Sequence, residues 1–239
     1  MSNIDKDYRL FLNNSKSPLY SKFNNFTKFV KRQTLARFIA IYEIFKMQKN
    51  MKGSVIDCGV NEGMSLMSLA QLSTILEPYN YHRNIFGFDT FEGFPKVSKK
   101  DKNNKISRKG FFKHKYNSYQ EIIKSINFYN NNRFLNKKNK IQLIKGDATK
   151  TIPVFLKKNK HLIISSLWLD FDIYEPTKVA LEYFSNHLVN GSIIVFDELN
   201  NPMWPGETQA FLEFKKIKYK KISCFDFEPN LSYIVITKT

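Results

Sequence analysis

The feature that most constrains the fold is an alternation of short apolar runs with longer helix-type segments. The apolar runs cover 54–60, 84–89, 141–147, 161–170 and 192–198, and each has a glycine or an acid at or next to its last position. Runs of this kind indicate strands buried on both faces, and intervening helices make such strands parallel. The sequence therefore predicts an α/β fold with a doubly wound, mostly parallel sheet.

The remaining segments complete this expected domain. Helices are expected over 33–48, 63–76, 116–129, 148–158, 176–188 and 206–217. Asn190-Gly191 reads as a turn, and the runs on either side of Glu228-Pro229-Asn230 predict a closing antiparallel hairpin. Residues 1–32 are polar, carry scattered aromatics and show no clear period, so we treat them as an extension before one domain over 33–239.

An aspartate lies at or near the carboxyl end of each predicted parallel strand. These residues are Asp57, Asp89, Asp147, Asp170 and Asp197. One such acid alone is as well explained as a helix cap. Ligands of doubly wound sheets bind beyond the carboxyl ends of the strands. Five acids there predict a ligand that carries hydroxyls, positive charge or a metal.

The loop Asp57-Cys-Gly-Val-Asn-Glu-Gly63 joins the first strand to its helix. Gly59 permits a sharp turn, but neither the dinucleotide glycine pattern nor a phosphate loop is present. Glu62 would repel a pyrophosphate, whereas S-adenosylmethionine has no phosphate and carries a sulfonium and an ammonium. Asp89 is placed for ribose hydroxyls and Asp147 for the adenine amino group. The predicted cofactor-binding residues are Asp57, Gly59, Asn61, Gly63, Asp89, Asp147 and Ala148.

Four segments carry a resemblance to a known family. D-x-G-x-x-x-G, G-F-D-T-F-E-G-F-P (87–95), L-D-F-D-I-Y-E-P-T (169–177) and F-D-E-L (196–199) follow strands one, two, four and five. Between Gln33 and Lys216 the sequence resembles the macrocin O-methyltransferase-type family. The resemblance implies a Rossmann-like class I methyltransferase sheet, S-adenosylmethionine as cofactor, and a sugar or related polyhydroxy molecule as substrate.

The resemblance also implies a Mg²⁺ site. Carried over by position, its ligands are Asp170, Asp197 and Glu198, with Glu198 in place of the second acid of an Asp-Asp pair. Mg²⁺ would template the substrate and activate its hydroxyl. Asp170 and Asp172 are the predicted catalytic residues, Asp172 as a base or as an aligning group, although a helix-capping role explains Asp172 equally well. Trp204 either stacks on a ligand or caps the core.

The chain is strongly basic, with 38 Lys and Arg against 21 Asp and Glu and a net charge of +17. This charge suggests a polyanion partner. However, 96–116 alone holds nine Lys or Arg and one acid, Asp101, between strands two and three. This basic insertion is either a lid for an anionic sugar or a solvated loop.

We do not expect nucleic acid as the substrate, because no N/D-P-P-Y/F motif follows strand four. An RNA O-methyltransferase and a non-catalytic cofactor- or carbohydrate-binding module remain the alternatives.

Three further expectations concern the surroundings of the protein. No apolar run of about 18 residues occurs, so no membrane span is expected. Cys58 and Cys224 allow at most one disulfide, and a reduced, cytoplasmic protein is the default. The family often assembles, so the N-terminal aromatics either serve a homo-oligomer interface or cover the core.

Overall fold

The computed structural model describes residues 3–101 and 106–237. Its centre is a seven-stranded sheet in the order β3-β2-β1-β4-β5-β7-β6. The strands are β1 (Ser54–Cys58), β2 (Ile85–Asp89), β3 (Ile141–Lys145), β4 (Ile164–Leu169), β5 (Leu188–Phe196), β6 (Ser223–Phe225) and β7 (Glu228–Val235). The first five strands are parallel, and β7 pairs antiparallel with both β5 and β6. The predicted parallel sheet with a closing antiparallel hairpin is therefore confirmed.

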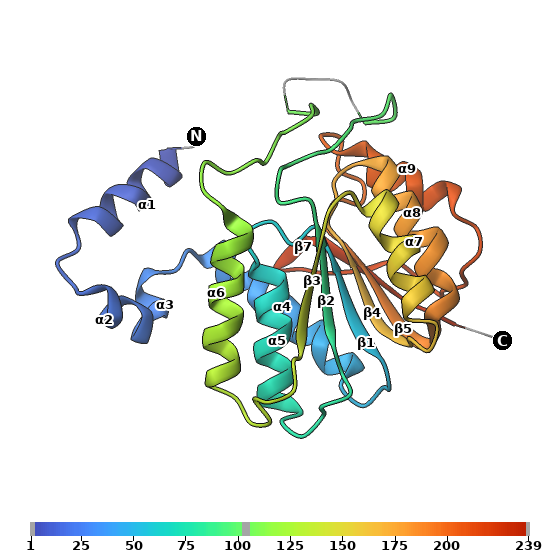
Figure 1. Ribbon diagram of the computed structural model, residues 1–239. Helices are drawn as coiled ribbons and strands as arrows, with labels where there is room; N and C mark the ends of the chain where they lie inside the picture. Colours follow the sequence, from blue (N-terminus) through green and yellow to red (C-terminus); the bar gives the residue numbers. More distant parts are fainter. Residues whose placement is uncertain (1–2, 102–105, 238–239) are drawn as a thin grey trace.

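Helices cover both faces of the sheet (Figure 1). One face carries α4 (Arg32–Gln48), α5 (Met64–Leu76) and α6 (Ser118–Asn131). The other carries α7 (Ala148–Lys158), α8 (Tyr174–Phe184) and α9 (Pro205–Glu213), and a short 3₁₀ turn, Ser185–His187, follows α8. The chain runs outward from β1 to β3 and then crosses to β4, so the winding direction reverses between β1 and β4. In doubly wound sheets, ligands bind at such a reversal.

The core lies on both faces because side chains alternate along each strand. On β1, Ile56 and Cys58 pack in the cluster under α7 and α8, whereas Val55 packs in the cluster under α4 and α5. Phe88 of β2 belongs to the first cluster and contacts the rings of Phe155 and Phe184. This double burial explains why the strand sequences are almost continuously apolar.

One prediction of local structure is wrong. Asn190-Gly191 is not a turn between helix and strand, because β5 already begins at Leu188, which pairs with Ile164 of β4. Gly191 has a φ of +86°, and its N–H donates to the carbonyl of Ile236, so the strand continues through it. Residues 3–29, which show no clear period in the sequence, form α1 (Asn3–Asn14), α2 (Leu19–Asn24) and α3 (Phe26–Phe29).

These three helices form an N-terminal arm (residues 3–30) that projects away from the sheet and its covering helices (Figure 1). The arm holds together through Phe29, whose carbonyl accepts from the Tyr8 hydroxyl and whose ring stacks on Phe11. Leu19, Tyr20 and Phe23 on its outer side are 70%, 79% and 71% exposed. The arm aromatics therefore do not cover the core of the domain.

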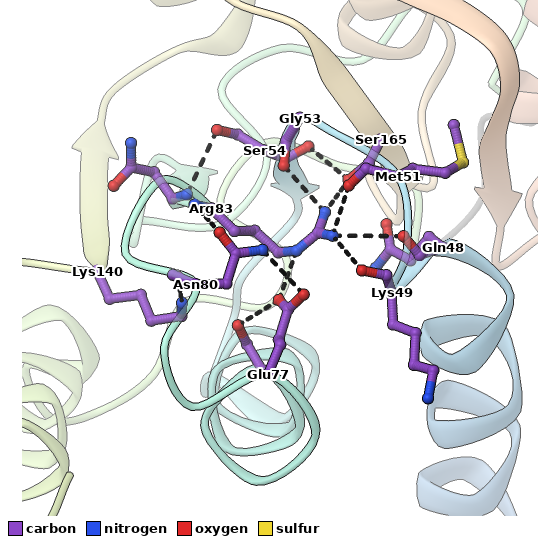
Figure 2. A network of polar contacts seen from close by, with 12 residues as sticks. Gln48, Lys49, Met51, Gly53, Ser54, Glu77, Asn80, Arg83, Lys140 and Ser165 are labelled. Atoms are coloured by element: carbon purple, nitrogen blue, oxygen red, sulfur yellow. Dashed lines mark hydrogen bonds and ion pairs between the residues drawn. The ribbon is translucent and has the colours of Figure 1, made fainter. Parts of the chain in front are cut away.

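Arg83, a buried arginine, links several chain segments near the amino ends of the parallel strands (Figure 2). Arg83 is 1% exposed and donates through Nε to the Glu77 carboxylate. Its terminal nitrogens donate to the Ser165 hydroxyl and to four main-chain carbonyls, those of Gln48, Lys49, Met51 and Gly53. One side chain thus joins the end of α4, the start of β1, and β4.

In the part of the chain that the structure describes, no helix is long and apolar enough to cross a membrane. Cys58 is buried and Cys224 is exposed, and neither forms a disulfide.

Candidate active site at the carboxyl edge of the sheet

The β1–α5 loop and the chain after β4 meet at the reversal point of the sheet. The Asp170 N–H donates to the Cys58 carbonyl at 2.9 Å, and the Gly59 N–H donates to the Phe88 carbonyl at 2.9 Å. Gly59 has a φ of +93°, and a Cβ placed on it would lie 1.9 Å from the Asp170 carbonyl oxygen. Only a glycine fits this crossing, which brings the predicted cofactor loop against the predicted catalytic acid.

We therefore expect Gly59→Ala to disrupt the site. The added methyl group must displace the Asp170 main chain. In addition, an alanine held in the left-handed conformation of residue 59 adds strain of about 1–3 kcal/mol. S-adenosylhomocysteine affinity, measured by calorimetry, should fall at least about tenfold, since 1.4 kcal/mol corresponds to a factor of ten. Gly110→Ala is a matched control, because Gly110 has a φ of +75° but open space around its Cβ position. Equal affinities for the two variants would contradict this packing argument.

Asp89 is held at the end of β2 by two main-chain groups. Its Oδ2 accepts from the Asn61 N–H at 2.7 Å and its Oδ1 from the Phe91 N–H at 2.6 Å. Asn61 and Phe91 have φ values of +49° and +57°, so both turns are shaped around this carboxylate. Burial raises the pKa of Asp89, and the two N–H donors oppose that effect. The carboxylate keeps lone pairs free for further hydrogen-bond donors.

A cavity of about 280 Å³ opens beside Asp89. Eight of the predicted site residues line it: Gly59, Asn61, Asp89, Ala148, Asp170, Asp172, Asp197 and Glu198. The cavity continues past Phe94 and Phe112 to Trp204, which is 9% exposed. Trp204 therefore belongs both to a buried aromatic cluster and to the cavity wall.

A second cavity of about 310 Å³ borders the predicted cofactor loop. Asp57 lines it, together with Ser65, whose hydroxyl donates to Asp57 Oδ2 at 2.9 Å. Burial raises the pKa of Asp57 to about 7. Asn61, Asp170 and Asp197 line both cavities, so the two spaces meet at these residues.

The structure places two predicted cofactor residues differently. Asp147 Oδ1 accepts from the N–H of Thr149 at 3.0 Å and from its hydroxyl at 2.7 Å, so this carboxylate caps α7. Gly63 has a φ of +91° at the start of α5 and packs close to Ile122. Among the described lining residues of both cavities, Asp147 and Gly63 do not occur, whereas Gly146 and Ala148 beside Asp147 do line the first.

Carboxylates crowd together where the two cavities meet. Burial raises the pKa of Asp170 well above its usual range, and Asp197 and Asp172 raise it further. Burial also raises the pKa of Asp172 well above its usual range, and the charges of Glu198 and Asp197 raise it further. The backbone of Asp172 is left-handed, with a φ of +60°. The pKa of Glu198 is raised to about 6 by burial and by Asp197. The cluster therefore carries more negative charge than its surroundings neutralise.

Glu207 at the start of α9 supports this cluster and was not foreseen from the sequence. It is 0% exposed, and its Oε1 accepts from the Glu198 N–H at 2.8 Å. Its Oε2 is buried without a hydrogen-bond partner among the described residues. Burial raises the pKa of Glu207 well above its usual range, so its neutral form is favoured. Its position shortly after Trp204 was visible in the sequence, but its burial was not.

Arg37 of α4 was also missed. Its Nη1 donates to Asp197 Oδ1, which pairs the two residues across 160 positions of sequence. The one available signal was an arginine standing between Ala36 and Phe38 in an otherwise apolar stretch of helix. Arg37 is the one cation on the wall of the second cavity among its described lining residues.

The first described part of the basic insertion, residues 96–101, is anchored to two helices. Asp101, its one acid, is 2% exposed and accepts from the Tyr174 N–H at 2.6 Å and from the Ser98 N–H at 2.7 Å. Lys100 pairs with Glu213 of α9. The insertion is therefore held to the start of α8 and to the end of α9, the two helices that follow the predicted catalytic acids. Residues 102–105 of the predicted lid lie outside the described residues.

The far end of the insertion contacts the predicted cofactor loop. His114 Nε2 lies 2.6 Å from Asn61 Oδ1, and the Tyr116 hydroxyl donates to the Glu62 carboxylate. Phe111 and Phe112 contact Trp204, with ring centroids 6.0 and 5.8 Å apart. These contacts explain why the segment forms a wall of the first cavity.

The chemistry of the acids fits a hard divalent cation. Asp170, Asp197 and Glu198 offer carboxylate oxygens, the ligands that Mg²⁺ prefers. Their raised pKa values indicate charge that a cation would neutralise. As the side chains stand, however, no three His, Cys, Asp or Glu residues within 3–101 and 106–237 are arranged to hold a metal ion together.

Comparison with known proteins gives a consistent result. Residues 27–224 match the macrocin O-methyltransferase (TylF) family. The crystal structure of CalS11, a calicheamicin methyltransferase, is 29% identical, covers 96% of this chain and 90% of its own, and superposes with a TM-score of 0.91. An apo structure of CalS11, described as a TDP-rhamnose 3′-O-methyltransferase of calicheamicin biosynthesis, is 26% identical over 96% of this chain and 91% of its own, with a TM-score of 0.81.

The O-methyltransferase NovP shares the fold, at 18% identity over 85% of this chain and 80% of its own, with a TM-score of 0.62. No curated protein matches the sequence.

Proposed function

The chain belongs to the macrocin O-methyltransferase family, and from this membership we propose that it transfers the methyl group of S-adenosylmethionine to a sugar hydroxyl. Members of this family are S-adenosylmethionine-dependent O-methyltransferases. One observation carries the proposal: the cavity beside the ribose-type acid Asp89 is continuous with the carboxylate cluster at Asp170 and Asp172. A cofactor and an acceptor hydroxyl can therefore meet there.

In the proposed site, Asp89 holds the ribose hydroxyls, and Ala148 lies where the adenine would pack. The acceptor oxygen attacks the methyl carbon in line with its bond to sulfur, and S-adenosylhomocysteine leaves. The hydroxyl proton passes to Asp170 or Asp172, whose raised pKa values make them better bases than ordinary aspartates. Holding both reactants in one cavity supplies the orientation that the transfer requires.

We also propose that Asp170, Asp197 and Glu198 hold Mg²⁺. When bound, Mg²⁺ would lower the pKa of the acceptor hydroxyl and fix neighbouring substrate oxygens. The raised pKa of Glu198, about 6, supports this assignment, because the site favours binding of positive charge.

The metal assignment predicts a dependence on divalent cations. Turnover should be lost after EDTA treatment and restored by Mg²⁺. Mn²⁺ bound to the protein should be detectable by electron paramagnetic resonance. Glu198→Gln should weaken that binding, whereas Glu182→Gln, at a half-exposed position of α8 that pairs with Lys178, should not. Unchanged turnover in EDTA would show that the carboxylates act without a metal.

The substrate we propose is an anionic sugar, such as one linked to a nucleoside diphosphate. Five cations of the basic insertion are exposed and have no ion pair among the described residues: Lys96, Lys99, Arg108, Lys109 and Lys115. The match to a relative described as acting on TDP-rhamnose supports the same class. The aromatic wall of Phe112 and Trp204 suits the apolar face of a sugar ring.

A mass-spectrometric screen tests this proposal. Neutral sugars, uronic acids, nucleoside-diphosphate sugars and a structured RNA are each incubated with the protein, S-adenosylmethionine and Mg²⁺. The nucleoside-diphosphate sugars should gain one methyl group fastest. Methylation of the RNA would favour the alternative of an RNA O-methyltransferase, and no transfer to any acceptor would favour a non-catalytic module.

Placement in the cytoplasm and assembly into a homo-oligomer stay predictions. The exposed apolar side chains of the N-terminal arm, Leu19, Tyr20 and Phe23, are the surface that assembly would use.

A further inference from the structure

The N-terminal arm carries a dense set of exposed apolar side chains. Seven of them are between 45% and 79% exposed: Ile4, Leu10, Phe11, Leu19, Tyr20, Phe23 and Phe26. Leu19 and Phe23 lie one turn apart on α2 and so share a face of the helix, and no residue of α2 is buried. Folded proteins seldom leave a contiguous apolar surface uncovered, so we expect the arm to contact a partner.

The exposed surface of the arm is also basic. Its exposed cations, which form no ion pair among the described residues, are Lys6, Arg9, Lys16 and Lys28. Asp7 is the one exposed acid of the described arm, because Asp5 is less exposed and pairs with Lys31 at 3.1 Å. The arm therefore presents positive charge beside its apolar side chains.

Contacts inside the arm leave this surface facing outward. Lys22 Nζ donates to the Leu12 carbonyl at 2.9 Å and joins α2 to α1, while the Tyr8 hydroxyl donates to the carbonyl of the buried Phe29. The exposed side chains are thus not the ones that hold the three helices together. Because the arm projects from the domain, a broad, flat partner can reach it without meeting the sheet or its covering helices (Figure 1).

The cations distinguish between the partners that could cover such a surface. A symmetric contact between two copies sets a patch against itself, which would bring the arm cations together in a protein whose net charge is already +17. Single-stranded nucleic acid pairs with cations but stacks on rings, and Ile4, Leu10 and Leu19 have none. An anionic lipid surface attracts the cations and accepts aliphatic and aromatic side chains alike.

We propose that the N-terminal arm binds the surface of an anionic lipid bilayer and lies among the headgroups without spanning the membrane. Leu19, Tyr20 and Phe23 enter the boundary between headgroups and acyl chains, and Lys16 and Lys28 meet the lipid phosphates. The strength of such binding follows the buried apolar area and the charge of the lipids. The proposal does not depend on the reaction that the domain catalyses.

Sedimentation of the full chain with lipid vesicles tests this proposal. Vesicles of phosphatidylcholine and phosphatidylglycerol should bind the protein at least about tenfold more tightly than vesicles of phosphatidylcholine alone, because four exposed cations meet anionic lipid. Added salt should weaken the binding, since it screens exposed charges. Phe23→Ser should lower the affinity roughly tenfold, because an inserted aromatic side chain is lost. Its Tm should stay at the wild-type value, because Phe23 is exposed.

Two further variants make the test specific. Phe128→Ser is the matched control, because Phe128 of α6 is also 71% exposed, and it should leave vesicle affinity unchanged. Tyr20→Trp reports insertion: the native Trp168 and Trp204 are buried in the domain, so quenching by brominated acyl chains should appear only in this variant.

The proposal is overturned if the anionic vesicles do not bind, or if Phe23→Ser and Phe128→Ser lose affinity equally. Analytical ultracentrifugation without lipid, and titration with a labelled single-stranded RNA, examine the other partners. A dimer that Phe23→Ser dissociates, in protein that ignores vesicles, would assign the arm to a second copy of the chain. An RNA complex that behaves in the same way would assign it to nucleic acid.

Discussion

Asp170→Asn should reduce kcat by roughly 10²–10⁴-fold, the range typical of a lost general base, and leave S-adenosylhomocysteine affinity within a few-fold of wild type. The substitution keeps the size of the side chain and removes its charge from the point where the two cavities meet. Asp170 is proposed both as a proton acceptor and as a ligand for Mg²⁺, so its loss affects the reacting oxygen twice. Initial rates with saturating acceptor, together with calorimetry, separate the two effects.

Asp226→Asn provides the control for this experiment. Asp226 is an exposed aspartate in the turn between β6 and β7, so the same chemical change there should leave both kcat and affinity unaltered. A kcat near the wild-type value in Asp170→Asn would remove Asp170 from the mechanism. A large loss of cofactor affinity instead would indicate a binding role.

Arg83→Met should lower the free energy of unfolding by about 3–5 kcal/mol, the usual cost of breaking a buried ion pair. The substitution leaves Glu77 without its cation and removes donors from four main-chain carbonyls at the end of α4 and the start of β1. Methionine fills similar volume, so the loss reports the polar network and not a cavity. Urea unfolding followed by circular dichroism measures the change.

Arg9→Met, an exposed position on α1, should change the unfolding free energy little. Glu77→Gln tests the same network from the other partner and should destabilise by a smaller amount, because glutamine can still accept from Arg83. If Arg83→Met unfolds at the wild-type urea concentration, the network does not stabilise the domain.

Much of the fold could be predicted because one physical rule governs it. Strands covered on both faces must be apolar throughout, and this pattern located β1 to β5 within a few residues. The antiparallel closing pair was marked by Glu228-Pro229-Asn230 between two strand-type runs. The N-terminal arm escaped prediction because its helices are short and pack around Phe29 instead of against the sheet, so no core-facing period arises.

The candidate site was predictable only in part. Strand-end acids follow from parallel topology, and Asp89, Asp170 and Asp197 do line the cavities. Asp147 lies at a strand end for a different reason, since it caps α7. Arg37 and Glu207 could not be found from local sequence, because their importance comes from contacts between distant elements.

The basic insertion shows a similar limit. Its charge was visible in the sequence and suggested a lid or a solvated loop. What anchors it is the one acid, Asp101, buried against the first turn of α8. The charge count alone could not predict that the Asp101 carboxylate is buried and accepts a hydrogen bond from a main-chain N–H.

The most direct test follows the methyl carbon itself. S-adenosylmethionine labelled with ¹³C in its methyl group is incubated with the protein, Mg²⁺, a nucleoside-diphosphate sugar and a structured RNA in one sample, and the label is traced by nuclear magnetic resonance. We predict that an O-methyl signal appears on the sugar and is lost in Asp170→Asn. A label that moves to the RNA, or that stays on the cofactor with every sugar tested, would contradict the proposed sugar O-methyltransferase.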